Sequence, residues 1–183
     1  MIPLFHRASW LVAWAFVAVA AEAPVDAPAP SKDRVGFPDG YQKSFTVLRA
    51  FNRPGENKVV TVYGNKEAAS VKTVSELPYP NGSVLVMETA LATKDAAGKP
   101  VTEANGIFQK DQITGLHVMR REMGFGEAYQ TNRTGAWEYV EYRGDGTFIT
   151  PPIKSAACAA CHVKAGEKMD FVYHGRFSPP AEK

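Results

Sequence analysis

The chain contains two cysteines, Cys158 and Cys161, which are separated by two alanines and followed at once by His162. Two thiols at this spacing can add to the two vinyl groups of one protoporphyrin, and the adjacent histidine is then delivered to the iron. Two cysteines, two intervening residues and a histidine form the pattern typical of haem c attachment. We therefore predict one covalently bound haem c, with His162 as the axial ligand of its iron.

Three other kinds of site use cysteines at this spacing. In an oxidising compartment the two cysteines could pair as a disulfide. A thioredoxin-like dithiol would normally lie beside a βαβ unit, and we find no such pattern in the sequence. A zinc ion would need two further ligands, and the remaining histidines are His6, His117 and His174. Haem c is the interpretation that uses both cysteines and the histidine.

The N-terminus has the composition of a cleavable signal peptide, residues 1–20. Arg7 is its only charged residue, and residues 11–20 are almost entirely apolar. Ala18-Val19-Ala20 offers the small residues that signal peptidase recognises, so we expect cleavage after Ala20 and a periplasmic or secreted protein. The apolar run is shorter than the ~20 residues of a typical membrane span. An uncleaved membrane anchor is the alternative.

The remainder of the chain is expected to hold one folded domain. Residues 21–34 are rich in Pro and Ala and read as a linker, residues 35–179 as the domain, and residues 180–183 as a tail. Loss of Arg7 with the signal peptide takes the formal net charge from +2 to +1. Two haem propionates would make the net charge of the holoprotein slightly negative. A net charge this close to zero argues against a nucleic-acid-binding protein. No later stretch is apolar enough for a stable membrane span.

Strand-like patterns outnumber helical ones along the domain. Segments rich in β-branched and aromatic residues alternate with turn sequences, which is typical of antiparallel strands. The expected strands are residues 45–51, 58–63, 83–91, 106–109, 115–120 and 136–143, and the expected helices are residues 64–77 and 154–165. The sequence therefore predicts an α+β fold, an antiparallel sheet with flanking helices and the haem-binding motif on a C-terminal helix.

A series of short motifs precedes and follows the cysteine motif, which itself lies near the C-terminus of a β-rich chain. In chain order they are Pro38-Asp39-Gly40-Tyr41, Val60-Thr61-Val62-Tyr63-Gly64-Asn65, Pro80-Asn81-Gly82-Ser83-Val84, Asn105-Gly106-Ile107-Phe108, Gly115-Leu116, Gly135-Ala136-Trp137-Glu138-Tyr139, Asp170-Phe171-Val172-Tyr173 and Arg176-Phe177. In order and spacing the chain resembles the cytochrome P-460 family and its relative cytochrome c′-beta. The resemblance implies a small, usually dimeric antiparallel-sheet domain whose haem has its distal face against the sheet.

Three positions depart from what the resemblance implies for the catalytic members. Those members cross-link a strand lysine to the porphyrin, which enables hydroxylamine oxidation, whereas this chain has Met87 there and its next lysine at Lys94. A thioether cannot form an amine–porphyrin bond. Where those members have an acidic distal residue, this chain has His117. Where some members have a distal arginine, this chain has Val60. The resemblance is therefore closer to the cytochrome c′-beta side, whose members bind nitric oxide or other small gases.

Three residues besides the cysteine motif are candidate haem contacts, and each has a structural alternative. Met87 lies on an alternating strand, where methionine often fills a core. His117 could bind the distal ligand or be a hydrogen-bonded structural histidine. Arg176 could pair with a haem propionate or with a surface carboxylate.

The sequence thus predicts an exported mono-haem c-type cytochrome that transfers electrons to a redox partner protein, binds small gaseous ligands such as nitric oxide, or does both. The alternative is an enzyme that oxidises hydroxylamine or another small nitrogen compound, or a weak peroxidase, with His117 moving protons. We favour the binding and redox functions and assign no catalytic residue. From the resemblance we also expect a homodimer.

Overall fold

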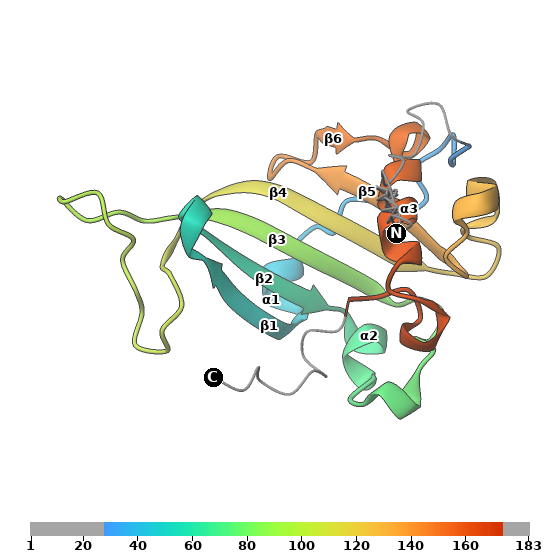
Figure 1. Cartoon of the computed structure of the whole chain (residues 1–183), viewed down its shortest axis with the longest axis horizontal. Coiled ribbons are helices and arrows are strands. Elements are labelled where there is room, and N and C mark those ends of the chain that lie inside the picture. The colour runs from blue at the N-terminus through green and yellow to red at the C-terminus, as the bar shows by residue number, and fades with distance from the viewer. Residues whose placement is uncertain (1–27, 174–183) are drawn as a thin grey trace, which may run out of the picture.

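The computed structural model describes residues 28–173, which are organised around one antiparallel sheet (Figure 1). Its six strands lie side by side in chain order. They are β1 (Thr46–Arg53), β2 (Lys58–Gly64), β3 (Val84–Ala92), β4 (Lys110–Arg121), β5 (Trp137–Tyr142) and β6 (Phe148–Thr150). The α-helices are α1 (Tyr41–Ser44), α2 (Lys66–Ser70) and α3 (Ala156–Val163), and the 3-10 helices are η1 (Pro54–Glu56), η2 (Val74–Glu76), η3 (Glu127–Asn132), η4 (Pro152–Lys154) and η5 (Glu167–Met169). The predicted α+β class is confirmed.

The expected strands coincide with observed ones except for residues 106–109, where the prediction is wrong. There the chain forms a single isolated bridge, Thr102 with Phe108, inside the long connection between β3 and β4. Gly106 has φ 82°, and its N–H donates to the Glu103 carbonyl at 2.9 Å. This tight turn prevents residues 106–109 from forming the strand that the apolar Ile107 and Phe108 had suggested.

The single helix expected over residues 64–77 is also wrong, because two short helices occupy this segment. The Asn65 side chain accepts a hydrogen bond from the Ala68 N–H and so begins α2. Val71 is extended and ends that helix. A capping box between Thr73 and Glu76 then begins η2. Two local start signals therefore outweigh the helical spacing of the apolar residues.

The sheet buries apolar side chains on both faces, because successive residues of a strand point to opposite sides. On one face the core contains Val35, Tyr41, Tyr63, Val86, Leu116, Val118, Val140 and Tyr142. On the other face it contains Ala68, Val71, Tyr79, Leu85, Met119, Tyr129, Trp137, Tyr139, Ala159 and Val172. Helix α3 contributes Ala159 to this second core and packs on η3 and β5. We call this second side the α3 face.

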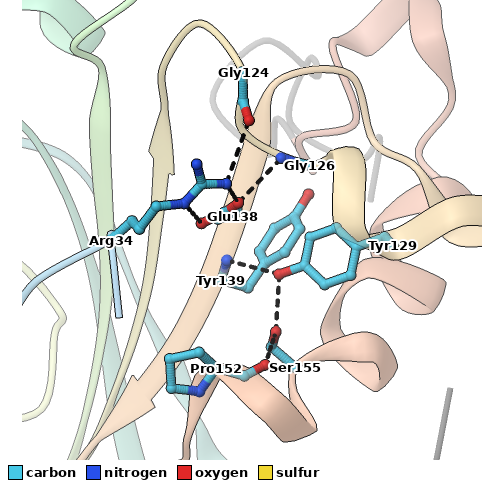
Figure 2. A network of polar contacts seen from close by, with 8 residues as sticks. All are labelled: Arg34, Gly124, Gly126, Tyr129, Glu138, Tyr139, Pro152 and Ser155. Carbon is cyan, nitrogen blue, oxygen red and sulfur yellow. Dashed lines mark hydrogen bonds and ion pairs between the residues drawn. The ribbon is translucent and has the colours of Figure 1, made fainter. Parts of the chain in front are cut away.

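Part of the segment expected to be a linker contacts the sheet. Arg34 forms an ion pair with the buried carboxylate of Glu138 and donates to the Gly124 carbonyl at 3.3 Å (Figure 2). The Tyr142 hydroxyl donates to Asp33 at 2.6 Å. Ordered contacts with the domain therefore begin before residue 35.

Among the residues that the structure describes, none belongs to a helix long and apolar enough to cross a bilayer. The expected signal peptide, residues 1–20, and the expected tail, residues 180–183, lie outside the described range.

Candidate functional site

The three residues of the cysteine motif lie on helix α3. Cys158, Cys161 and His162 are spaced at i, i+3 and i+4, which brings them to neighbouring positions on one side of a helix. Cys158 is half-buried and packs against the core of the α3 face, whereas Cys161 is exposed. Both are free thiols in the structure. One side of a single helix thus presents two thiols and an imidazole.

The His162 imidazole is held in one orientation by its surroundings. Its Nδ1 lies 2.7 Å from the Phe171 carbonyl oxygen, and because a carbonyl can only accept, Nδ1 carries the proton. The Tyr139 ring lies against the imidazole with 4.6 Å between ring centroids and 32° between planes. The free lone pair therefore resides on Nε2, the nitrogen that a metal-binding histidine offers when its other nitrogen is hydrogen-bonded.

Burial lowers the pKa of His162 below its ordinary value, and the nearby His117 adds to this effect, whereas the hydrogen bond to Phe171 opposes it. The neutral imidazole is the form that binds a metal. Burial also raises the pKa of the Cys158 thiol to about 11, with a smaller contribution from the charge of Glu141. His117 and Glu141, both on the sheet, therefore lie within electrostatic reach of α3.

The start of α3 is fixed to the sheet through a buried tyrosine (Figure 2). The Tyr129 hydroxyl lies 2.8 Å from the Ser155 hydroxyl and accepts a hydrogen bond from the Tyr139 N–H at 3.2 Å. Ser155, which immediately precedes α3, donates in turn to the Pro152 carbonyl at 2.6 Å. The helix that carries the cysteine motif is therefore tied to β5, the strand whose Tyr139 contacts His162.

A row of side chains crosses the sheet on the α3 face. Strand register pairs Val62 with Met87, Met87 with His117, His117 with Glu141, and Glu141 with Thr150. We call these five residues the cross-strand row. Met87 is half-buried, and 48% of the His117 side chain is exposed. The structure therefore brings the two distal candidates together on the side of the sheet where α3 lies.

Glu141 and Thr150 are residues that sequence reasoning missed. The Nε2 of His117 lies 3.2 Å from one carboxylate oxygen of Glu141, and the Thr150 hydroxyl donates to the other at 2.8 Å. The alternation of β5 could have placed Glu141 on the same face as Tyr139. Its pairing with His117 depends on the register between β4 and β5, which local sequence does not specify.

The remaining site predictions fall away from this row. Lys94 lies beyond the end of β3, where it forms an isolated bridge with Pro100. Arg176 lies outside the described residues. In residues 28–173, no three side chains of His, Cys, Asp or Glu come together as a site for a metal ion. The zinc alternative therefore gains no further ligands from this part of the chain.

The residues of α3 and the row fit a haem c group. A neutral imidazole with its Nε2 free matches the axial ligand of a c-type haem, and two thiols one helical turn apart match its two vinyl attachments. Aromatic and apolar side chains, among them Tyr139 and Met87, would supply the surroundings that a largely apolar macrocycle needs.

Comparison with known families agrees with this chemistry. The model of the cytochrome P460 family matches residues 38–174, which is more than half of the chain. No curated protein matches the chain.

Proposed function

The chain belongs to the cytochrome P460 family and is a haem c cytochrome, and we propose that it is an exported mono-haem protein that binds nitric oxide or a similar small gas and exchanges electrons with a redox partner. The observation that carries this proposal is the hydrogen bond of 2.7 Å from His162 Nδ1 to Phe171, because it leaves Nε2 available as the axial ligand. Haem c, when bound, supplies an iron with a sixth position for small ligands and a reversible oxidation state.

Each residue of α3 has a distinct part in this proposal. Cys158 and Cys161 form the two thioether bonds, and His162 supplies the proximal ligand. Cys161 is exposed, and the Tyr173 hydroxyl donates to its backbone carbonyl at 2.8 Å. A group attached to Cys161 would come near solvent at this exposed end of α3, and we infer that the redox partner docks there.

The cross-strand row forms the distal side in this proposal. Met87 occupies the position where the resemblance places the cross-linking lysine of catalytic members, and Lys94 lies too far along the chain, beyond β3. No amine of this strand is therefore available for a bond to the porphyrin. His117, held by Glu141, supplies a hydrogen-bonding group that acts on a ligand at the sixth position.

A second candidate function has one observation in its favour. The His117–Glu141 pair is an acid–base pair on the α3 face, and oxidation of hydroxylamine or another small nitrogen compound requires proton transfer to such a group. The chain would then be an enzyme without the lysine cross-link. We place this second, because the departures from the catalytic members include the residue on which their chemistry depends.

Absorption spectra of the purified full-length holoprotein test the proposal. The ferrous protein, titrated anaerobically with nitric oxide or carbon monoxide, is expected to show a haem c spectrum that changes with ligand at one equivalent per chain. The variant His162→Ala should lose this spectrum while Cys158 and Cys161 still allow attachment. A wild-type protein without haem, or an unchanged spectrum in His162→Ala, would contradict the proposal.

A further inference from the structure

Two consecutive residues next to the proximal histidine have a backbone conformation that L-amino acids rarely adopt. Asp170 has φ 47° and Phe171 has φ 58°. A non-glycine residue in this left-handed region is uncommon. Aspartate tolerates it better than most residues, whereas a bulky residue such as phenylalanine is an outlier there. Such a conformation persists only where the surrounding structure enforces it, and it is found most often at functional sites.

The side chain of Asp170 ties this left-handed turn to two other segments. Asp170 is 5% exposed, and one carboxylate oxygen accepts the Tyr79 N–H at 2.9 Å and faces the Arg121 Nε at 3.3 Å. Arg121, at the end of β4, also donates to the Asn81 side chain at 2.9 Å. The carboxylate therefore connects the turn to the end of a central strand and to the segment that precedes β3.

The Phe171 side of the turn is fixed by a backbone hydrogen bond, because the Phe171 N–H donates to the Gly166 carbonyl at 3.0 Å. Gly135 has φ 62°, and a Cβ at that position would lie 3.5 Å from the Phe171 ring. Gly135, on the segment that leads into β5, thus lies beside the Phe171 ring. With both residues fixed, the carbonyl of Phe171 points at His162 Nδ1, 2.7 Å away.

We propose that Asp170, held by Arg121, is the positioning residue of the proximal histidine: it maintains the left-handed turn whose carbonyl fixes the tautomer of His162 and its strength as an electron donor to iron. This inference rests on the proposed function, since it requires His162 to bind the iron. A hydrogen bond from the far nitrogen of a ligating histidine orients the ring and raises its basicity. If the turn relaxes, the hydrogen bond to Phe171 weakens and His162 donates less electron density to the iron. The ferrous state is then favoured over the ferric state.

The test compares reduction potentials of full-length holoproteins carrying Asp170→Asn or Arg121→Gln. If the turn relaxes, both variants have a more positive potential than the wild type. If the two residues act on the iron only through their charges, the potentials move in opposite directions, because one variant removes a negative charge and the other a positive charge. Asp145→Asn, which removes an exposed turn carboxylate bonded to Thr147, is the control and should leave the potential unchanged.

The iron–histidine stretching band, recorded by resonance Raman on the ferrous protein or on its photolysed carbon monoxide adduct, gives a second readout. We expect a shift to lower frequency in both Asp170→Asn and Arg121→Gln, with the haem still attached and the circular dichroism unchanged. An unshifted band together with potentials that move in opposite directions would overturn the inference. Absence of haem from the wild type would instead overturn the proposed function, so the two failures are distinguishable.

Discussion

Met87 on β3 and His117 on β4 are cross-strand partners on the α3 face of the sheet. Their side chains therefore start from neighbouring backbone positions, with Cβ atoms about 4.5–5.5 Å apart. Glu141 continues the same row and binds His117. The cross-strand row, which we propose as the distal side, thus contains a thioether and an imidazole bonded to a carboxylate, and no lysine lies in it.

The first prediction is that the holoprotein has an ordinary haem c absorption spectrum without a porphyrin–lysine bond. Met87 cannot form such a bond, and Lys94 lies past the end of β3. Mass spectrometry of proteolytic peptides should therefore find haem only on the peptide that contains Cys158 and Cys161. Hydroxylamine turnover should be negligible. A strongly red-shifted Soret band, or haem on a peptide with Lys94, would refute this.

The second prediction is covalent attachment through both thiols. The intact mass of the purified protein should exceed that of the processed chain by one haem. Cys158→Ala and Cys161→Ala should each retain a single thioether bond, and the double variant should lose the adduct under denaturing conditions. A wild-type mass that is only two hydrogens below that of the reduced apo-chain would show a disulfide and exclude haem c.

The third prediction concerns the reactivity of the two thiols in the apo-protein. Burial raises the pKa of Cys158 from 9.0 to about 11, so at pH 8 its thiolate is about 100-fold scarcer than for an unshifted thiol. Because the thiolate is the nucleophile, iodoacetamide should modify the exposed Cys161 first. The Cys158 rate should climb as the pH approaches 11. Equal rates for both cysteines at pH 8, measured by peptide mapping, would contradict this.

The sequence predicted those parts of the site that local patterns specify. The spacing of Cys158, Cys161 and His162 is a local pattern, and the α-helix that carries them followed from good helix formers without glycine or proline. Strand alternation likewise placed Met87 and His117 on strands of the sheet.

The missed parts depend on contacts between distant segments. Glu141 joins His117 only through the register of β4 with β5. The carboxylate of Asp170 is bound by Tyr79 and Arg121, which are far away in the chain. Aspartate tolerates positive φ, but the sequence around Asp170 does not mark a second left-handed residue at Phe171, because bulky residues rarely adopt this conformation.

The fourth prediction is that the segment before residue 35 contributes to folding stability. Glu138 is buried and accepts Arg34 and the Gly126 N–H, the latter at 3.3 Å. Arg34→Met leaves the buried carboxylate of Glu138 without a cationic partner. The substitution should therefore lower the free energy of unfolding by about 1–3 kcal/mol. The lower end is expected, because 43% of the Arg34 side chain is exposed and solvent screens the pair.

Urea denaturation measures this effect, and Arg53→Met is its control. Arg53 pairs with Glu56 at 3.7 Å between two exposed side chains, so this substitution should cost less than about 0.5 kcal/mol. Equal midpoints for Arg34→Met and wild type would show that the Arg34–Glu138 pair contributes nothing to stability.

The last prediction concerns the sixth coordination position, where gas binding and electron transfer make opposite demands. An open position admits a small ligand without displacing a protein group, whereas a second protein ligand keeps the coordination unchanged between oxidation states. Neither Met87 nor His117 lies in a flexible loop, since both are on paired central strands. We therefore expect a five-coordinate or weakly six-coordinate ferrous haem that binds nitric oxide and carbon monoxide readily.

Two substitutions test His117 and Glu141 separately. Their effects are read from the dissociation rates of bound nitric oxide or carbon monoxide, measured by stopped-flow mixing. In our proposal His117 donates a hydrogen bond to the bound ligand, worth about 1 kcal/mol, so His117→Leu should raise the dissociation rate about fivefold. Glu141→Gln keeps the imidazole but weakens its anchor, so we expect a smaller change in the same direction. Glu122→Gln, which disturbs a partly exposed carboxylate paired with Arg120 outside the cross-strand row, should have no effect. A ferrous protein that is low-spin, resists carbon monoxide and becomes high-spin only in Met87→Ala would instead be a His/Met electron carrier, because the thioether would then hold the position that a gas needs.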